Sequence, residues 1–160
     1  MANPLRADAA EQRKRVRAAF DAMVAQADKR DLVDRRLAAV GFCFGGGNVL
    51  ELARDGADLA AAVSIHGDLK TALPAKRGAI KAGRCWWPMV WRIRWCRRPI
   101  ATEMNAAGAK WQMVVFSGVL HAYTDQGADV PGVAGCEEAA PRQTCVLTHQ
   151  FLADAFVARL

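Results

Sequence analysis

The sequence predicts an α/β fold, with a mainly parallel sheet flanked by helices. Three short apolar runs bounded by polar or turn-forming residues are typical of buried strands. They alternate with stretches whose apolar residues recur at helical spacing, which is typical of a parallel sheet with helices on its faces. One strand also leads through a glycine-rich turn directly into a helix. With 160 residues the chain is long enough for a real core, and we expect a single domain over 1–160.

The first half of the chain predicts two helices and two strands. Apolar residues at helical spacing over 8–27 predict an amphipathic helix that packs on another element. The apolar stretch Leu37–Val40 predicts a strand, and Asn48–Arg54 reads as the first turns of a helix that ends near Asp55-Gly56. The run Leu59–Ile65 predicts a second buried strand.

The second half continues the alternation. A helix is expected over 101–107, stopped by Gly108, and a strand over 111–116. A long loop rich in glycine, proline and acidic residues follows over 125–141, and a closing helix over 146–160. The order of these elements supports the α/β prediction.

The most informative motif is Gly41-Phe42-Cys43-Phe44-Gly45, between a predicted strand and a predicted helix. Strand, Gly-x-Cys-x-Gly, helix is the layout of a nucleophile elbow, with cysteine in place of the usual serine. Glycines flank the nucleophile because the sharp turn leaves no room for a Cβ. The start of a helix also favours a thiolate. The alternative is that Cys43 is merely a small apolar residue in a tight turn. A dinucleotide or phosphate loop fits the glycine spacing worse.

A cysteine nucleophile needs a base, and the chain offers three histidines. His149 falls inside the closing helix and has no obvious partner. His66 follows a strand but precedes the place where an acid is expected. His121 follows the strand over 111–116, at the sheet edge where catalytic groups of such folds lie. The chain order nucleophile, acid, histidine favours Cys43 and His121 as the pair, and a locally bonded loop histidine is the alternative.

Four motifs carry a resemblance to a known family. They are Leu37–Gly46, Ala62–Gly67, Glu103–Gly108 and Ser117–Tyr123. Together they resemble the dienelactone hydrolase family, over about 6–156 with one gap. The resemblance implies a partial α/β-hydrolase fold that acts on ester or lactone bonds. It also implies Cys43 as nucleophile, His121 as base and the backbone N–H of Phe44 as half of the oxyanion hole.

The chain departs from the family pattern at its front. Family members carry further strands before the helix that begins here near Asp8. Those strands supply the second oxyanion N–H and much of the substrate pocket. We therefore expect an N-terminally truncated domain without the front strands, in which Met1 is an internal methionine of a longer reading frame.

The second departure is the Trp/Arg-rich segment 84–100, an anomalous stretch that falls where the family pattern expects a strand and the catalytic acid. It holds four of the five tryptophans, and Pro88 argues against a central strand. No acid here matches the triad position. Asp68 and Asp125 lie nearby in sequence but do not match the pattern either.

A local frameshift would explain this segment. When the codons of Trp86–Trp95 are read in another frame, they permit the peptide Val-Ala-His-Gly-x-Ala-Asp-Pro. The family pattern has such a motif at this place. We hypothesise that the shift enters near Gly83 and is restored near Ile100. Resequencing the DNA across this window tests the idea, and a confirmed frame without compensating slips contradicts it.

Composition limits the remaining functions. The net charge is +6 and the isoelectric point about 9.4, but five arginines between Arg84 and Arg98 carry almost all of that charge. Basic residues interleaved with aromatics also suit nucleic acid, the competing interpretation of this segment. The five cysteines show no zinc spacing, and nothing in the sequence resembles a signal peptide or a membrane span.

The sequence therefore predicts a cytoplasmic hydrolase of small ester or lactone substrates. We expect no cofactor, no metal, no nucleic acid and no membrane partner. Because no triad acid can be matched, the chain reads as incomplete as a catalyst. The alternative is a non-catalytic hydrolase fragment or pseudoenzyme.

Overall fold

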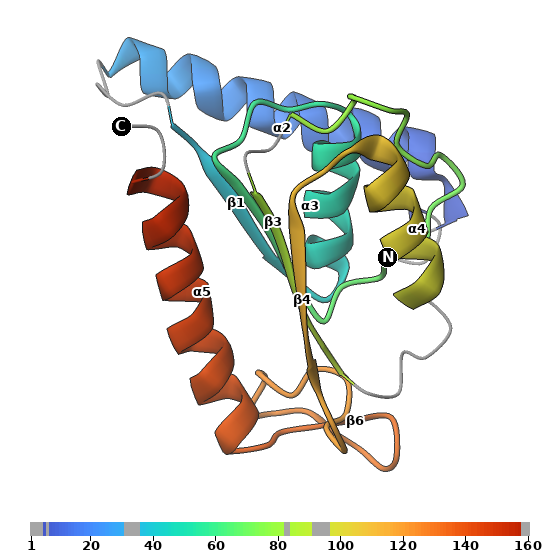
Figure 1. The fold of residues 1–160 in the computed structure, drawn as a ribbon. Coiled ribbons are helices and arrows are strands. Elements are labelled where there is room, and N and C mark those ends of the chain that lie inside the picture. Colours follow the sequence, from blue (N-terminus) through green and yellow to red (C-terminus); the bar gives the residue numbers. More distant parts are fainter. Residues whose placement is uncertain (1–4, 6, 31–35, 82–83, 91–96, 158–160) are drawn as a thin grey trace.

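The computed structural model describes residues 5, 7–30, 36–81, 84–90 and 97–157. Its centre is a sheet of four parallel strands in the order β1-β2-β3-β4 (Figure 1). The strands are β1 Ala38–Phe42, β2 Ala61–Ile65, β3 Arg84–Val90 and β4 Trp111–Phe116. The α/β fold with a parallel sheet is thus confirmed, and β4 has the bounds that the sequence predicts.

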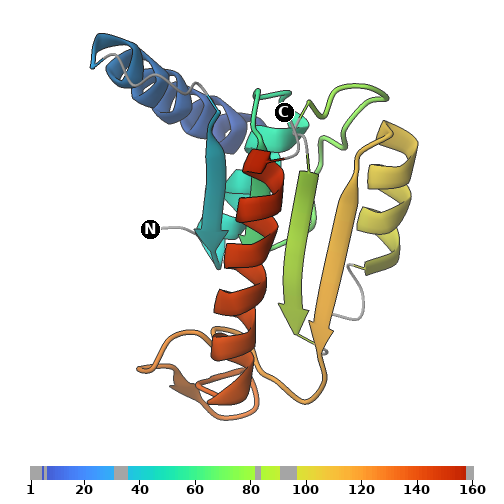
Figure 2. The ribbon, with the colours of Figure 1, turned by 60° about the vertical axis from the view of Figure 1, so that its left-hand side comes forward.

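Helices cover both faces of this sheet (Figures 1 and 2). On one face lie α3 (Phe44–Arg54) and α4 (Arg97–Ala107), with α2 (Ala9–Lys29) packed against α3. On the other face lies α5 (Ala139–Val157). Because both faces are covered, every residue of β2 is buried, as is usual in parallel sheets.

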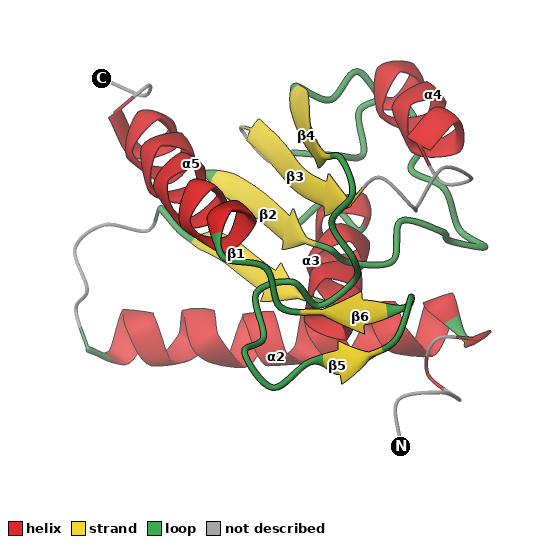
Figure 3. Ribbon diagram, turned by 90° about the horizontal axis from the view of Figure 1, so that it is seen from below, coloured by secondary structure: helices red, strands yellow, loops and turns green. Residues whose placement is uncertain are grey.

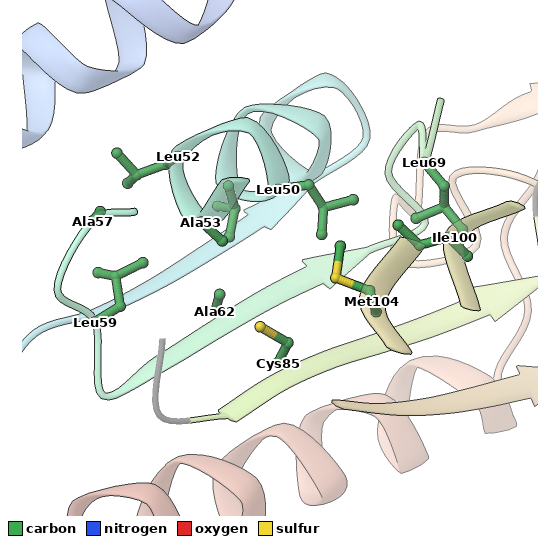
Figure 4. Packing of buried hydrophobic residues seen from close by; sticks show 11 residues of the cluster. Leu50, Leu52, Ala53, Ala57, Leu59, Ala62, Leu69, Cys85, Ile100 and Met104 are labelled. Carbon is green, nitrogen blue, oxygen red and sulfur yellow. The ribbon is translucent and has the colours of Figure 1, made fainter. Parts of the chain in front are cut away.

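The core is split by the sheet into two layers. Between α3, α4 and the strands, Leu50, Ile100 and Met104 pack around Ala62 and Cys85 (Figure 4). Between α5 and the strands, Val63 and Ile65 join another buried cluster. Side chains therefore alternate along β2 between the two layers, as the period of a strand requires. The α5 layer contains Ala61, Val63, Ile65, Trp86, Val119, Tyr123, Ala140, Phe151 and Ala155.

A small antiparallel hairpin lies beyond the carboxyl end of the parallel strands (Figure 3). It consists of β5 (Asp129–Val130) and β6 (Ala134–Gly135). The sequence predicts only a loop here, since each strand is two residues long and carries no periodic pattern.

Three helices begin earlier than the sequence predicts. α3 begins at Phe44 and includes the glycines of the turn, and α4 begins at Arg97 rather than near residue 101. α5 begins at Ala139, so that Pro141 lies in its first turn. Proline is tolerated there because the first N–H groups of a helix have no partner within it.

Pro88 argues against a central strand in the sequence, and this expectation is wrong. β3 lies between β2 and β4, and its pairing with β4 runs through Pro88. The N–H of Cys85 donates to the carbonyl of Lys110 on the β4 side, and alternation then turns the nitrogen of Pro88 towards β2. Pairing between β2 and β3 ends at Trp86, so no ladder bond needs the missing N–H.

Among the described residues, no helix combines the length and the apolar character needed to cross a bilayer.

Candidate active site

Cys43 occupies the sharp turn between β1 and α3. Its backbone has φ 50° and ψ −120°, a conformation that L-residues rarely adopt. Its N–H lies 3.1 Å from the carbonyl oxygen of Ile65 and 3.2 Å from Nδ1 of His66, and donates to both. Its carbonyl accepts from the N–H of Gly47 in the first turn of α3. The elbow predicted from the sequence is therefore present and is tied to the end of β2.

His121 reaches Cys43 from the loop after β4. The distance between Sγ of Cys43 and Nε2 of His121 is 3.2 Å, although 78 positions separate the two residues in the chain. The hairpin holds this loop, because the N–H of His121 donates to the carbonyl of Val133 and its own carbonyl accepts from Gly135. Both predicted side chains are half-buried and lie within hydrogen-bond reach of each other.

Phe44 is the first residue of α3. The N–H groups at the start of a helix together carry a partial positive charge. Phe44 therefore places its amide directly after Cys43, in the position where the sequence predicts half of an oxyanion hole.

The two acids near the pair in sequence make local bonds instead. The carboxylate of Asp68 accepts from the N–H of Lys70, and that of Asp125 accepts from the N–H of Gly127. Both are turn-stabilising contacts. The family pattern places the acid within the Trp/Arg-rich segment, of which residues 91–96 lie outside the described part of the chain.

His66, set aside as the base in the sequence because of its place in the chain order, also lies at this site. It follows β2 directly and is only 2% exposed. Its ring centroid lies 5.1 Å from that of His121, and its Nε2 lies 2.8 Å from Oγ1 of Thr124. Burial, with a smaller contribution from the nearby charge of His121, lowers the pKa of His66 to about 4. The available signal was its place after a buried strand, at the edge where Cys43 and His121 also lie.

His149 takes no part in this cluster of contacts. It lies on α5 and lines an apolar cleft, together with Val40 and Phe42 of β1. The three histidines therefore have different places. His121 lies beside Sγ of Cys43, His66 contacts the backbone of Cys43, and His149 lies on the surface of α5.

A parallel sheet with a strained Cys43 between strand and helix, and a histidine after a later strand, defines an α/β-hydrolase-type protein. The sequence model of the dienelactone hydrolase family matches residues 4–85. The chain belongs to the dienelactone hydrolase family.

Two solved structures resemble the chain over nearly its whole length. One, named m3DLH, is 32% identical with a TM-score of 0.82, and the match covers 96% of this chain and 65% of that one. The other is a dienelactone hydrolase-like promiscuous phosphotriesterase from metagenomic libraries, 30% identical with a TM-score of 0.78. That match covers 94% of this chain and 64% of the other. The chain thus spans just under two thirds of the length of these relatives. Comparison with curated proteins found no significant match.

Proposed function

We propose that this protein is a hydrolase of carboxylic esters or lactones that uses Cys43 as nucleophile and His121 as general base. The observation that carries the proposal is the 3.2 Å approach of Nε2 of His121 to Sγ of Cys43, at an elbow. Family membership supports the hydrolytic class. The geometry also favours His121 over His66, whose Nδ1 accepts from the backbone of Cys43.

The reaction proceeds through a thioester. His121 takes the proton from the thiol, and the sulfur attacks the carbonyl carbon, so that a C–S bond forms and the oxygen becomes an oxyanion. The N–H of Phe44 donates to this oxyanion. When the intermediate collapses, the alkoxide leaves with the proton from His121. His121 then deprotonates a water molecule, which cleaves the thioester and releases the acid and the thiol.

Hydrolysis of a p-nitrophenyl ester tests the proposal. We expect turnover by the wild type above the uncatalysed rate, and a fall of about a thousand-fold or more in Cys43→Ala and His121→Ala, because nucleophile and base act as a unit. Cys136→Ser is the matched control. The side chain of this cysteine is exposed and its Sγ contacts the carbonyl of its neighbour Glu137, so we expect no change in rate.

Two outcomes overturn the proposal. Equal turnover by the wild type and Cys43→Ala assigns the activity elsewhere. No turnover above background by the wild type supports the alternative, a non-catalytic hydrolase fragment.

Nucleic-acid binding gains no support from the described part of the Trp/Arg-rich segment. The side chain of Trp86 is buried and stacks on Phe151 of α5, with ring centroids 5.7 Å apart. A buried ring is not available to stack on a base.

The frameshift hypothesis stays a proposal, and one observation favours it. The family match ends at Cys85, the second residue of the Trp/Arg-rich segment. The segment nevertheless supplies β3, the strand expected at this place, so resequencing of the DNA remains the deciding measurement.

A further inference from the structure

His66 makes two polar contacts with two different parts of the site. Its Nδ1 lies 3.2 Å from the backbone nitrogen of Cys43, and its Nε2 lies 2.8 Å from Oγ1 of Thr124. Thr124 belongs to the same loop as His121. The imidazole therefore lies between the turn that contains Cys43 (the Cys43 turn) and the loop that contains His121 and Thr124 (the Thr124 loop), and contacts both.

The contacts fix which nitrogen carries the proton. A backbone N–H can only donate, so Nδ1 of His66 is an acceptor and carries no hydrogen. The neutral ring then has its proton on Nε2, which donates to the hydroxyl of Thr124. Burial and the nearby His121 lower the pKa of His66 to about 4, against a smaller opposing effect of Asp125, so the ring is neutral at pH 7.

Both connected segments have backbone conformations that need support. Cys43 has φ 50° and Ala122, next to His121, has φ 56°. Such conformations persist only where surrounding contacts hold them. The loop is also anchored by Tyr123, a fully buried residue whose hydroxyl bonds Oγ1 of Thr144 on α5 at 2.7 Å. No proton needs to move through His66 for it to serve as such a support.

We propose that His66 is a positioning residue, whose neutral imidazole bridges the Cys43 turn and the Thr124 loop and so holds Sγ of Cys43 against Nε2 of His121. The inference rests on the proposed function, because the aligned pair is the pair assigned to the chemistry. Misplacement of reacting groups by about 1 Å costs on the order of 100-fold in rate. The bridge should therefore act on kcat and leave KM nearly unchanged.

Substitutions at Thr124 test the bridge without altering His66, whose own backbone has a φ of 40°. Thr124→Val removes the hydroxyl and keeps the shape, whereas Thr124→Ser keeps the hydroxyl. We expect Thr124→Val to lower kcat by about 10- to 100-fold with KM within about twofold, and Thr124→Ser to stay near wild type. His66→Phe keeps a ring but loses both polar contacts, and we expect an equal or larger loss.

A second readout does not depend on turnover. The rate at which iodoacetamide alkylates Cys43, followed by peptide mass spectrometry, should fall in Thr124→Val and His66→Phe but not in Thr124→Ser. Alkylation of exposed Cys136 serves as the internal reference. Thermal unfolding midpoints show whether each variant is folded, and Thr124→Val decides the question if His66→Phe does not fold.

The bridge is overturned if Thr124→Val leaves both kcat and the alkylation rate of Cys43 within about twofold of wild type. It is also overturned if Thr124→Ser loses as much as Thr124→Val, because the hydroxyl is then not the essential group. If the wild type hydrolyses no ester, the proposed function fails, while the alkylation rates still decide the role of His66.

Discussion

Cys43 is held in a conformation that costs on the order of 1–3 kcal/mol. Hydrogen bonds from its N–H to the carbonyl of Ile65 and to Nδ1 of His66 offset part of that cost. The glycines of the elbow differ sharply in this respect. A Cβ on Gly41 would lie 2.3 Å from the carbonyl oxygen of Gly45, whereas a Cβ on Gly45 meets no described atom within 4 Å. The first glycine of the motif is therefore required by sterics, and the second is not.

This difference gives a matched pair of substitutions. Gly41→Ala should destabilise the protein by about 2 kcal/mol or more, because backbone must move to admit the methyl group. Gly45→Ala should be neutral or stabilise by about 0.5–1 kcal/mol, because Gly45 lies in α3, where alanine is the better helix former. Urea unfolding measures both. Equal losses in the two variants would contradict the steric account of the elbow.

At the scale of the elements, ion pairs between largely buried arginine and glutamate side chains link the helices on one face of the sheet. Arg54 of α3 is 1% exposed and binds both oxygens of Glu103 on α4, at 2.8 and 2.9 Å. It also binds Glu51, whose other oxygen accepts from Arg13 of α2 at 2.7 Å. The network thus joins α2, α3 and α4. α3 begins directly after Cys43, so the network also holds the helix that follows the Cys43 turn.

Removal of Arg54 should be costly because it leaves buried carboxylates without their partner. We expect Arg54→Met to lower the free energy of unfolding by about 3–5 kcal/mol. The same substitution at Arg15, whose side chain is 64% exposed in a pair with Glu11 on α2, should cost less than about 1 kcal/mol. Denaturant unfolding of both variants checks the contrast, and similar costs would show that the buried network adds little.

At the scale of the whole molecule, β1 forms one edge of the described sheet and carries exposed apolar side chains. Val40 is 42% exposed and Phe42 is 51% exposed. An apolar edge strand is a template for pairing with another chain, which favours self-association.

A charge placed on this edge should oppose association. We expect Val40→Lys to increase the monomeric fraction in light scattering coupled to size-exclusion chromatography. Val146→Lys is the control, because it adds the same charge to an exposed valine on α5. If both substitutions act equally, the added charge and not the sheet edge is responsible.

The sequence by itself determined the features that depend on neighbours along the chain. The period of apolar residues predicted β4 to the residue and the course of α2 closely, and the glycine pattern between strand and helix located Cys43. Chain order, together with its place just after a predicted strand, singled out His121. These signals are local, since a helical or strand period and a tight turn involve only a few consecutive residues.

Only the tertiary structure decided the features that depend on contacts between distant residues. Pro88 lies within β3 because the neighbouring strand ends its pairing before the proline, which nothing in the local sequence reveals. The approach of Cys43 to His121 and the bridge through His66 join three segments far apart in the chain. Such contacts depend on which strand ends share an edge of the sheet, and packing in three dimensions settles that.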